Sequence, residues 1–236
     1  MKKIIALVVV VIIVVSGLGY LGYIPGIASL FGWNSPRDLG VKAGIADYNS
    51  ASEKLGRERL ELPQGSNGDS IVFEGSHPID ASFTQEEMTA TWQTRDYEGN
   101  PFSNAGQIKI NEDNTVETSG ALDIELLLET IEKTVVIDEE TRALIDKAGF
   151  IKGDVPFYVK VNMAVTDGNW DINFQEAKLG FASIPVDQLP VDTLEDAARM
   201  AVDSIAGFSI ESLTVDNGKI NFKGMYPDKS YYLPAE

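Results

Sequence analysis

The chain has 236 residues, of which 44% are hydrophobic, which is enough for one globular domain with an appendage. It has no cysteine, which excludes disulfides, thiol catalysis and cysteine-ligated metal. The formal net charge is -17 and every acidic residue follows Trp33, so the rest of the chain repels phosphates and a nucleic-acid partner is excluded.

The first 24 residues are predicted to form a transmembrane anchor. Residues 4–24 are uncharged and apolar, and as a helix they would be about 31 Å long, enough to cross a hydrocarbon core. Because Lys2 and Lys3 precede them, we expect a single-pass protein of the cell membrane with a cytoplasmic N-terminus and an extracytoplasmic acidic domain. A cleaved signal peptide, ending near residues 26–28, is the alternative interpretation.

The end of this apolar segment contains two patterns. Residues 17–22 match the dinucleotide motif G-x-G-x-x-G, but that motif needs a preceding strand, so we expect no cofactor. Ser16, Gly19 and Gly22 form a smooth stripe on a helix, where a helix of another membrane subunit can pack. Glycines tolerated at a frayed helix end are an equal explanation.

The rest of the chain divides into three parts. Residues 25–44 are predicted to be a juxtamembrane linker because prolines and glycines recur there. Residues 45–227 are predicted to form the extracytoplasmic domain, and residues 228–236 a C-terminal tail.

Several helices are predicted within the domain. Residues 46–56 indicate a short helix that ends at its glycine. Thr84 and Glu87 form a capping box at the start of a second helix. Residues 123–147 indicate one or two helices, and residues 192–207 combine a second capping box with an apolar stripe and a terminal glycine.

A strand, an acidic turn and a second strand occur three times. Two-residue type I′ turns are predicted at 167–168 and 217–218, and a three-residue loop at 112–114 with Asn114 left-handed. The expected facing pairs are Val165 with Trp170, Met163 with Ile172, Val161 with Phe174, Val215 with Ile220, Leu213 with Phe222, and Ile110 with Val116.

The apolar alternation slips by one residue before Ala177 and again between Ile210 and Leu213, which predicts two β-bulges. Gly120, Gly180 and Gly224 lie inside strand patterns, where they permit sharp bends. The predicted fold class is therefore α+β: an N-terminal transmembrane helix, then curved antiparallel β-hairpins wrapped around α-helices.

Two phrases carry a family resemblance. The first is T-x-E-E-M-T-A, beginning at Thr84, and the second is G-x-I-x-F-x-G-x-x-P, beginning at Gly218. Over residues 70–227 the chain resembles membrane-anchored bacterial proteins similar to the LmeA-type phospholipid-binding proteins and, more remotely, the tubular lipid-binding superfamily. The resemblance implies a bent sheet around a long helix and an acyl-chain groove.

Enzyme chemistry finds little support in the sequence. His77 is the only histidine, and no G-x-S-x-G elbow accompanies it, so a surface loop residue is the favoured interpretation. The acidic residues 112–113 and 138–140 do not match a calcium loop, and we expect no metal site. A hydrolase stays the third alternative.

The sequence is compatible with two functions besides a hydrolase. The leading hypothesis is a membrane-tethered, extracytoplasmic lipid-binding or lipid-handling protein, and the second is a non-catalytic accessory or scaffold subunit of a membrane complex. A close-packed core without a lipid is an alternative explanation for the inward-facing apolar residues. The predicted lipid groove is lined by Val161, Met163, Ile172, Phe174, Ala177, Leu213, Ile220 and Phe222.

Overall fold

The computed structural model describes residues 35–62, 71–95, 97, 100–126, 154–180, 182–189 and 191–233. The strands in them are β1 (Glu58–Glu61), β2 (Ile71–Glu74), β3 (His77–Thr84), β4 (Gln107–Ile110), β5 (Val116–Asp123), β6 (Asp154–Thr166), β7 (Asn169–Leu179), β8 (Ala182–Ile184), β9 (Ser209–Asp216), β10 (Lys219–Tyr226) and β11 (Lys229–Tyr232). The helices are α2 (Ile45–Leu55), α3 (Gln85–Gln93), the 3-10 helix η2 (Val186–Gln188) and α6 (Val191–Asp203).

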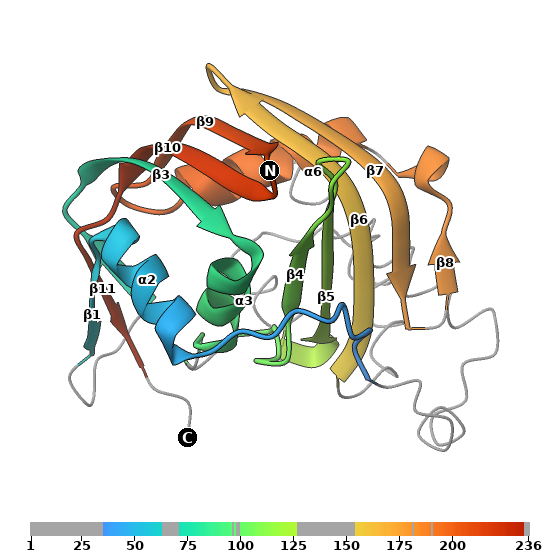
Figure 1. Cartoon of the computed structure of the whole chain (residues 1–236), viewed down its shortest axis with the longest axis horizontal. Helices are drawn as coiled ribbons and strands as arrows, with labels where there is room; N and C mark the ends of the chain where they lie inside the picture. The colour runs from blue at the N-terminus through green and yellow to red at the C-terminus, as the bar shows by residue number, and fades with distance from the viewer. Residues whose placement is uncertain are drawn as a thin grey trace, which may run out of the picture.

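Eight strands form one sheet in two halves. The order is β3-β10-β9-β6-β5-β4, with β7 beside β6 and β8 beside β7. β9 and β6 share only the pairs Val165↔Leu213 and Thr166↔Ser212. We call β3, β10 and β9 the β10 half-sheet, and β4 to β8 the β6 half-sheet. Figure 1 shows the halves as two sides of an arch, with α2 and α3 beneath β3.

The predicted α+β fold class is wrong. The described residues form a mainly β structure rather than an α+β one, because strands such as β1, β2, β8 and β11 carry no long alternating pattern in the sequence. No helix among the described residues is long and apolar enough to cross a membrane. The segment 4–24, with Ser16, Gly19 and Gly22, lies outside the described residues, as does most of 123–147.

The three predicted hairpins are confirmed. Asn114, Asp167 and Asn217 have φ values of 60, 51 and 52°, the left-handed conformation that the predicted turns require. The observed pairs include Ile110↔Val116, Val165↔Trp170, Met163↔Ile172, Val161↔Phe174, Val215↔Ile220 and Leu213↔Phe222.

Both predicted β-bulges are also present. The β6–β7 register shifts at Lys160/Val161, and the β9–β10 register shifts at Lys223/Gly224. At the second bulge the backbones approach so closely that a Cβ on Gly224 would lie 2.0 Å from the Ser209 carbonyl oxygen. The glycine therefore allows the strand to bend there.

The β10 half-sheet packs its apolar face on α2. Phe83, Ile79, Phe222 and Ala51 form a buried cluster, and Leu213 packs against it. The Phe208 ring stacks on Phe222, with 5.7 Å between their centroids. Because Ala51 belongs to α2, this contact fixes the helix against the sheet.

The β6 half-sheet is covered on both faces. On one face Trp92 of α3 stacks on Phe157, with ring centroids 6.1 Å apart, above Gly120. The next residue, Tyr158, points to the other face. There it is buried together with Leu39 and Val41.

Residues at both ends of the described chain join the domain. The segment 35–44, expected as a linker, contributes Leu39 and Val41 to that buried cluster. Leu39 also donates its N–H to Gln107 Oε1 at 2.8 Å. At the other end, part of the expected tail forms β11, which pairs with β1 and β2 in a separate 3-stranded sheet.

Side chains of α3 cover the free edge of β4. Gln85, Thr89 and Gln93 bond to the backbone of Ile110, Ile108 and Gly106, respectively, at 2.9 to 3.1 Å. Four helical residues rise about 6 Å and two strand residues about 6.6 Å, so every fourth helical residue meets every second strand residue. This ladder blocks an edge that is otherwise open to pairing with another strand.

Two other free edges have a helix side chain on them. Lys54 of α2 donates to the Ser82 carbonyl of β3 at 2.8 Å. Glu195 of α6 accepts the Ile172 N–H of β7 at 3.0 Å. The predicted capping box is confirmed, because Thr84 and Glu87 bond each other's backbone, and Glu87 also binds Lys54.

Candidate functional site

β5 and β9 lie end to end along one edge of β6. β5 pairs with β6 as far as Val161, which faces Val116. β9 starts pairing at Val165, which faces Leu213. Residues 162–164 lie between these contacts and have no strand partner on that edge among the described residues. We call this opening the sheet fork.

Met163 directs its backbone N–H and C=O into the sheet fork. The tight turn makes Thr166↔Asn169 a hydrogen-bonded pair, and such pairs alternate with non-bonded ones along an antiparallel ladder. Met163↔Ile172 is therefore non-bonded. The hydrogen bond of Ile172 supports this assignment, because its N–H points away from β6 and donates to Glu195. The backbone groups of Met163 consequently face the opposite edge.

Val215 presents its backbone to the same opening. Asp216↔Lys219 closes the β9–β10 turn, so the next pair, Val215↔Ile220, is non-bonded. The N–H and C=O of Val215 thus point away from β10. If β9 continued along β6 in its register, Val215 would face Met163, but no such pair forms.

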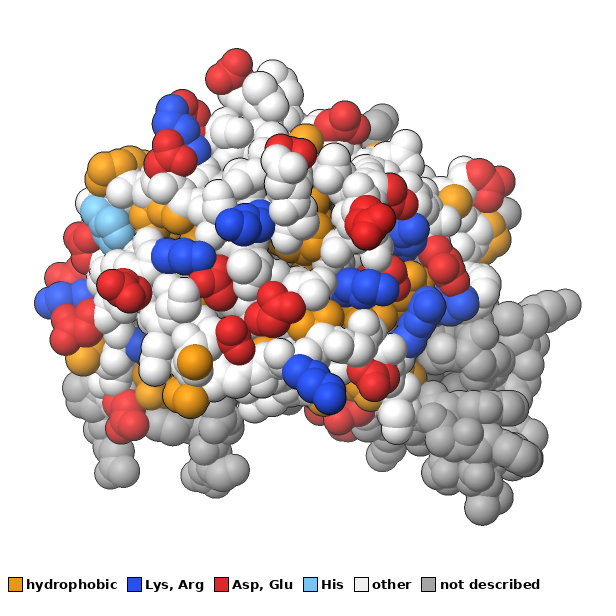
Figure 2. Space-filling model, in the orientation of Figure 1, with side chains coloured by type: hydrophobic (Ala, Val, Ile, Leu, Met, Phe, Trp, Pro, Cys, Tyr) orange, Lys and Arg blue, Asp and Glu red, His pale blue; other side chains and the backbone are white. Residues whose placement is uncertain are grey.

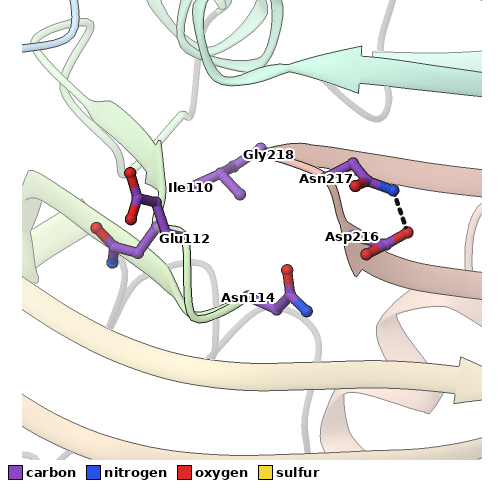
Figure 3. A pocket seen from close by; sticks show the side chains of 7 residues that line it. Ile110, Glu112, Asn114, Asp216, Asn217 and Gly218 are labelled. Carbon is purple, nitrogen blue, oxygen red and sulfur yellow. Dashed lines mark hydrogen bonds between the residues drawn. The ribbon is translucent and has the colours of Figure 1, made fainter.

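The first hollow of the sheet fork lies between two turn tips. Figure 3 shows Glu112 and Asn114 of the β4–β5 turn across from Asp216 and Asn217 of the β9–β10 turn. The hollow has a volume of about 450 Å³. Its lining consists of Ile110, Asn111, Glu112, Asn114, Asp216, Asn217 and Gly218.

The second hollow lies over the unpaired segment of β6 and has a volume of about 590 Å³. It shares Asn114 with the first hollow. Its lining is Asn114, Asn162, Met163, Ala164, Asp171, Asn173, Gln175, Thr214 and Val215. Both hollows have the size of small-ligand sites, but such sites are mostly apolar and these are mostly polar.

The lining is acidic and rich in amides. Among the residues that the structure describes, no lysine or arginine lines either hollow. In the part of the chain that the structure describes, Glu112, Asp171 and Asn173 make no side-chain hydrogen bond, so their oxygens are open to a ligand. Figure 2 shows charged groups of both signs over the rest of the face drawn. The site therefore disfavours anions and suits a ligand that donates hydrogen bonds.

Neighbouring contacts hold the wall of the sheet fork in place. Gln175 Nε2 donates to Asn162 Oδ1 at 2.6 Å, and Asn162 Nδ2 donates to the Asn114 carbonyl at 3.5 Å. In the β4–β5 turn, hydrogen bonds from the Thr115 hydroxyl and N–H lower the pKa of Asp113. Asp113 thus stays ionised and steadies the turn.

Comparisons with protein-family models, with curated proteins and with solved structures find no match. The resemblance to LmeA-type phospholipid-binding proteins therefore stays a prediction.

The eight residues of the predicted lipid groove share one face of the sheet but have different surroundings. Phe222 and Leu213 belong to the packed cluster on α2. Met163 lines the second hollow. Ile172 and Phe174 are half-buried on β7. The other buried members are Val161, Ala177 and Ile220.

His77 has a structural environment at the start of β3. Its Nδ1 lies 2.7 Å from Asp228 Oδ1, and its Nε2 lies 3.0 Å from the Leu55 carbonyl. The adjacent Ser76 hydroxyl donates to the Gly207 carbonyl at 3.0 Å. The ring therefore ties the end of α2 to the β10–β11 turn, and both of its nitrogens are engaged.

Sequence reasoning found parts of the sheet fork but not the site. Asn114, Asn217 and Gly218 were predicted as turn residues, and Met163 as a groove residue. That the two turns meet beside β6 depends on pairing between strands distant in sequence, which no local pattern encodes. Asn162, Asn173 and Gln175 alternate along β6 and β7 as polar strand residues do, without a separate signal.

Proposed function

We propose that the protein is a non-catalytic binding subunit whose ligand site is the sheet fork. The observation that carries this proposal is the pair of polar hollows beside backbone groups of Met163 and Val215, which no strand in the described residues uses. Unpaired strand groups at a solvent-facing site are available for recognition at little structural cost. The acidic lining selects a neutral or cationic ligand rich in hydrogen-bond donors.

The packing of the curved sheet supports a binding subunit over a lipid carrier. Phe222, at 8% exposed, contacts side chains of the α2 cluster rather than an apolar cavity. The two hollows at the sheet fork are lined mainly by amides and carboxylates, which an acyl chain would leave without hydrogen bonds. Lipid binding stays a prediction, and native mass spectrometry for co-purified lipid tests it.

The proposed function is tested by calorimetric titration with three probes. Spermidine is cationic, maltose is neutral and rich in hydroxyls, and citrate is anionic. We expect spermidine or maltose to bind and citrate not to bind. The double variant Glu112→Gln with Asp171→Asn should weaken the binding of spermidine by about tenfold or more.

Glu53→Gln provides the matched control, because Glu53 is an exposed acid on α2, away from both hollows. It changes the net charge without touching the sheet fork. The double variant removes two negative charges and Glu53→Gln removes one. If Glu53→Gln causes half or more of the loss of binding free energy seen in the double variant, the binding follows net charge and the site assignment fails. If no donor-rich probe binds, the proposed function fails.

The location outside the cytoplasm also stays a proposal. It is supported by the two N-terminal lysines and the acidic remainder of the chain. Protease added to intact cells should digest the domain. Complete protection of the domain, under conditions in which a known external protein is cut, would contradict the location.

A further inference from the structure

We propose that the ligand of the sheet fork is an extended segment of a partner protein, which adds as a short strand between β6 and β9. This inference rests on the proposed function and specifies its ligand. Met163 and Val215 both direct N–H and C=O groups into the gap, and neither residue pairs there with another strand of the described chain.

The backbone pattern favours a peptide over other donor-rich ligands. The N–H and C=O of one strand residue belong to two successive peptide units and point to the same side. Their complement is the C=O and N–H of a single residue in an extended chain. A polyamine offers donors without acceptors, and it therefore leaves the N–H of Met163 unpaired.

The direction of the added strand follows from its neighbours. β6 and β9 are antiparallel to each other. A strand between them is therefore antiparallel to one and parallel to the other. If it runs antiparallel to β6, the residue opposite Met163 bonds to Met163, and the two flanking residues point toward β9. In a parallel ladder those flanking residues bond to Val215. Both sets of unpaired groups are then used at once.

The two faces of the fork determine the side chains of the segment. Val165 and Leu213 are paired, so their side chains lie on the same face of the sheet. Met163 and Val215 are each two residues away along their strands, and they therefore lie on that face too. Asp171 and Asn173 lie on the opposite face, because they alternate with Ile172. A segment with apolar residues on the first face and lysines on the second therefore complements the fork.

The test uses the full chain and the acetylated, amidated peptide Val-Lys-Val-Lys-Val. Two control peptides keep the same charge but are N-methylated, one at the valines and the other at the lysines. N-methylation at valine removes the donors that face Met163, and N-methylation at lysine removes those that face Val215. We expect each control to bind about tenfold more weakly than the parent peptide.

Amide NMR titration provides a second readout. The parent peptide should shift the Met163 and Val215 amide signals, and Asp171→Asn should weaken binding of all three peptides. If the N-methylated peptides bind as tightly as the parent, or if the parent peptide does not bind, strand addition is wrong. The proposed function survives either result when maltose binds, or when spermidine binds with the expected loss in the Glu112→Gln, Asp171→Asn variant. It fails when neither of these two probes binds.

Discussion

The β10 half-sheet is covered by a helix on one face, whereas the β6 half-sheet is covered on both. In the first, Phe222 and Phe83 pack on α2, and the opposite face carries exposed residues such as Lys219 and Lys223. In the second, Trp92 covers one face and the segment containing Leu39 covers the other. Strand alternation therefore exposes polar residues in one half and buries them in the other.

The β6 half-sheet consequently needs internal partners for its polar groups. Tyr158 donates its hydroxyl to Glu117 at 2.9 Å, and burial together with this bond raises the pKa of Tyr158 to about 12. Glu117 also accepts from Asn111 at 2.9 Å. Among the described side chains, the buried hydroxyl of Ser119 has no hydrogen-bond partner. Double cover thus demands a polar network that a singly covered sheet avoids.

The largest effect is expected from a substitution in the β10 half-sheet, and it tests whether this half has a close-packed core. Phe222→Ala removes a buried ring that stacks on Phe208, and it should lower the free energy of unfolding by about 3–5 kcal/mol. Urea denaturation measures this loss. Met163→Ala is the control in the other half, because Met163 is half-buried beside a hollow and should cost clearly less. Equal losses would mean that the two sites are packed alike.

The second prediction tests whether the interior of the β6 half-sheet is close-packed or holds a lipid. Ala177 is 5% exposed and faces Val159 beside the bulge. In a close-packed interior, Ala177→Leu should cost about 1–3 kcal/mol through overpacking. The measurement combines the melting temperature with the lipid content of the purified protein. An unchanged melting temperature together with lost lipid would favour the lipid-handling hypothesis.

Local chemistry explains which parts of the fold were predictable. Asn217-Gly218 and the capping box at Thr84 were predictable because turn conformation and helix capping depend on neighbouring residues. β11 and β1 were not, because four-residue strands carry too little alternation. The fold class was wrong for the same reason: short strands outweigh the helices that the longer patterns favoured.

The candidate site shows the same limit. The apolar face that contains Phe222 and Met163 was predictable from period-two alternation. Its division into a packed core and an open fork was not, because it depends on where β9 leaves β6. Two residue pairs mark that point. The sequence near Val165 and Leu213 does not differ from that of other paired strands, so it gives no signal that the pairing ends there.

The third prediction concerns the link between α2 and α3, two helices that both lie beneath β3. Burial raises the pKa of Glu87, but hydrogen bonds from Lys54, Ser50 and the Thr84 N–H outweigh burial, so the pKa lies below its usual value. A carboxylate with a lowered folded-state pKa adds stability above its unfolded pKa of about 4.3, and that stability is lost as the pH falls through the folded-state value.

Glu87→Gln should therefore cost about 1–3 kcal/mol at neutral pH, and the difference from the original protein should shrink in acid. Urea denaturation at several pH values measures this difference. Glu86→Gln is the control at the adjacent position, because Glu86 does not contact Lys54 among the described hydrogen bonds. A loss that does not change with pH would contradict an ionised link.

The smallest effect is expected from substitutions in the two-residue turns, one between β6 and β7 and the other between β9 and β10. Gly218 and Gly168 have φ values of +71 and +76°, and apart from the neighbouring residues in the chain no described atom lies within 4 Å of an added Cβ at either site. Gly218→Val and Gly168→Val therefore test backbone strain alone, and each should cost about 1–2 kcal/mol. The melting temperatures of both variants provide the measurement.

The two variants should differ in their effect on the sheet fork. Gly168 lies next to Asp167, whose N–H donates to the Glu211 carbonyl of β9 at 3.1 Å, so strain there acts on the contact between the halves. Gly218 lines the first hollow instead. If the fork is a binding site, Gly218→Val should weaken the binding of spermidine more than Gly168→Val does at equal loss of stability. If both variants bind spermidine equally well, the β9–β10 turn is not part of the binding site. An unchanged melting temperature would contradict the left-handed conformation of the glycine.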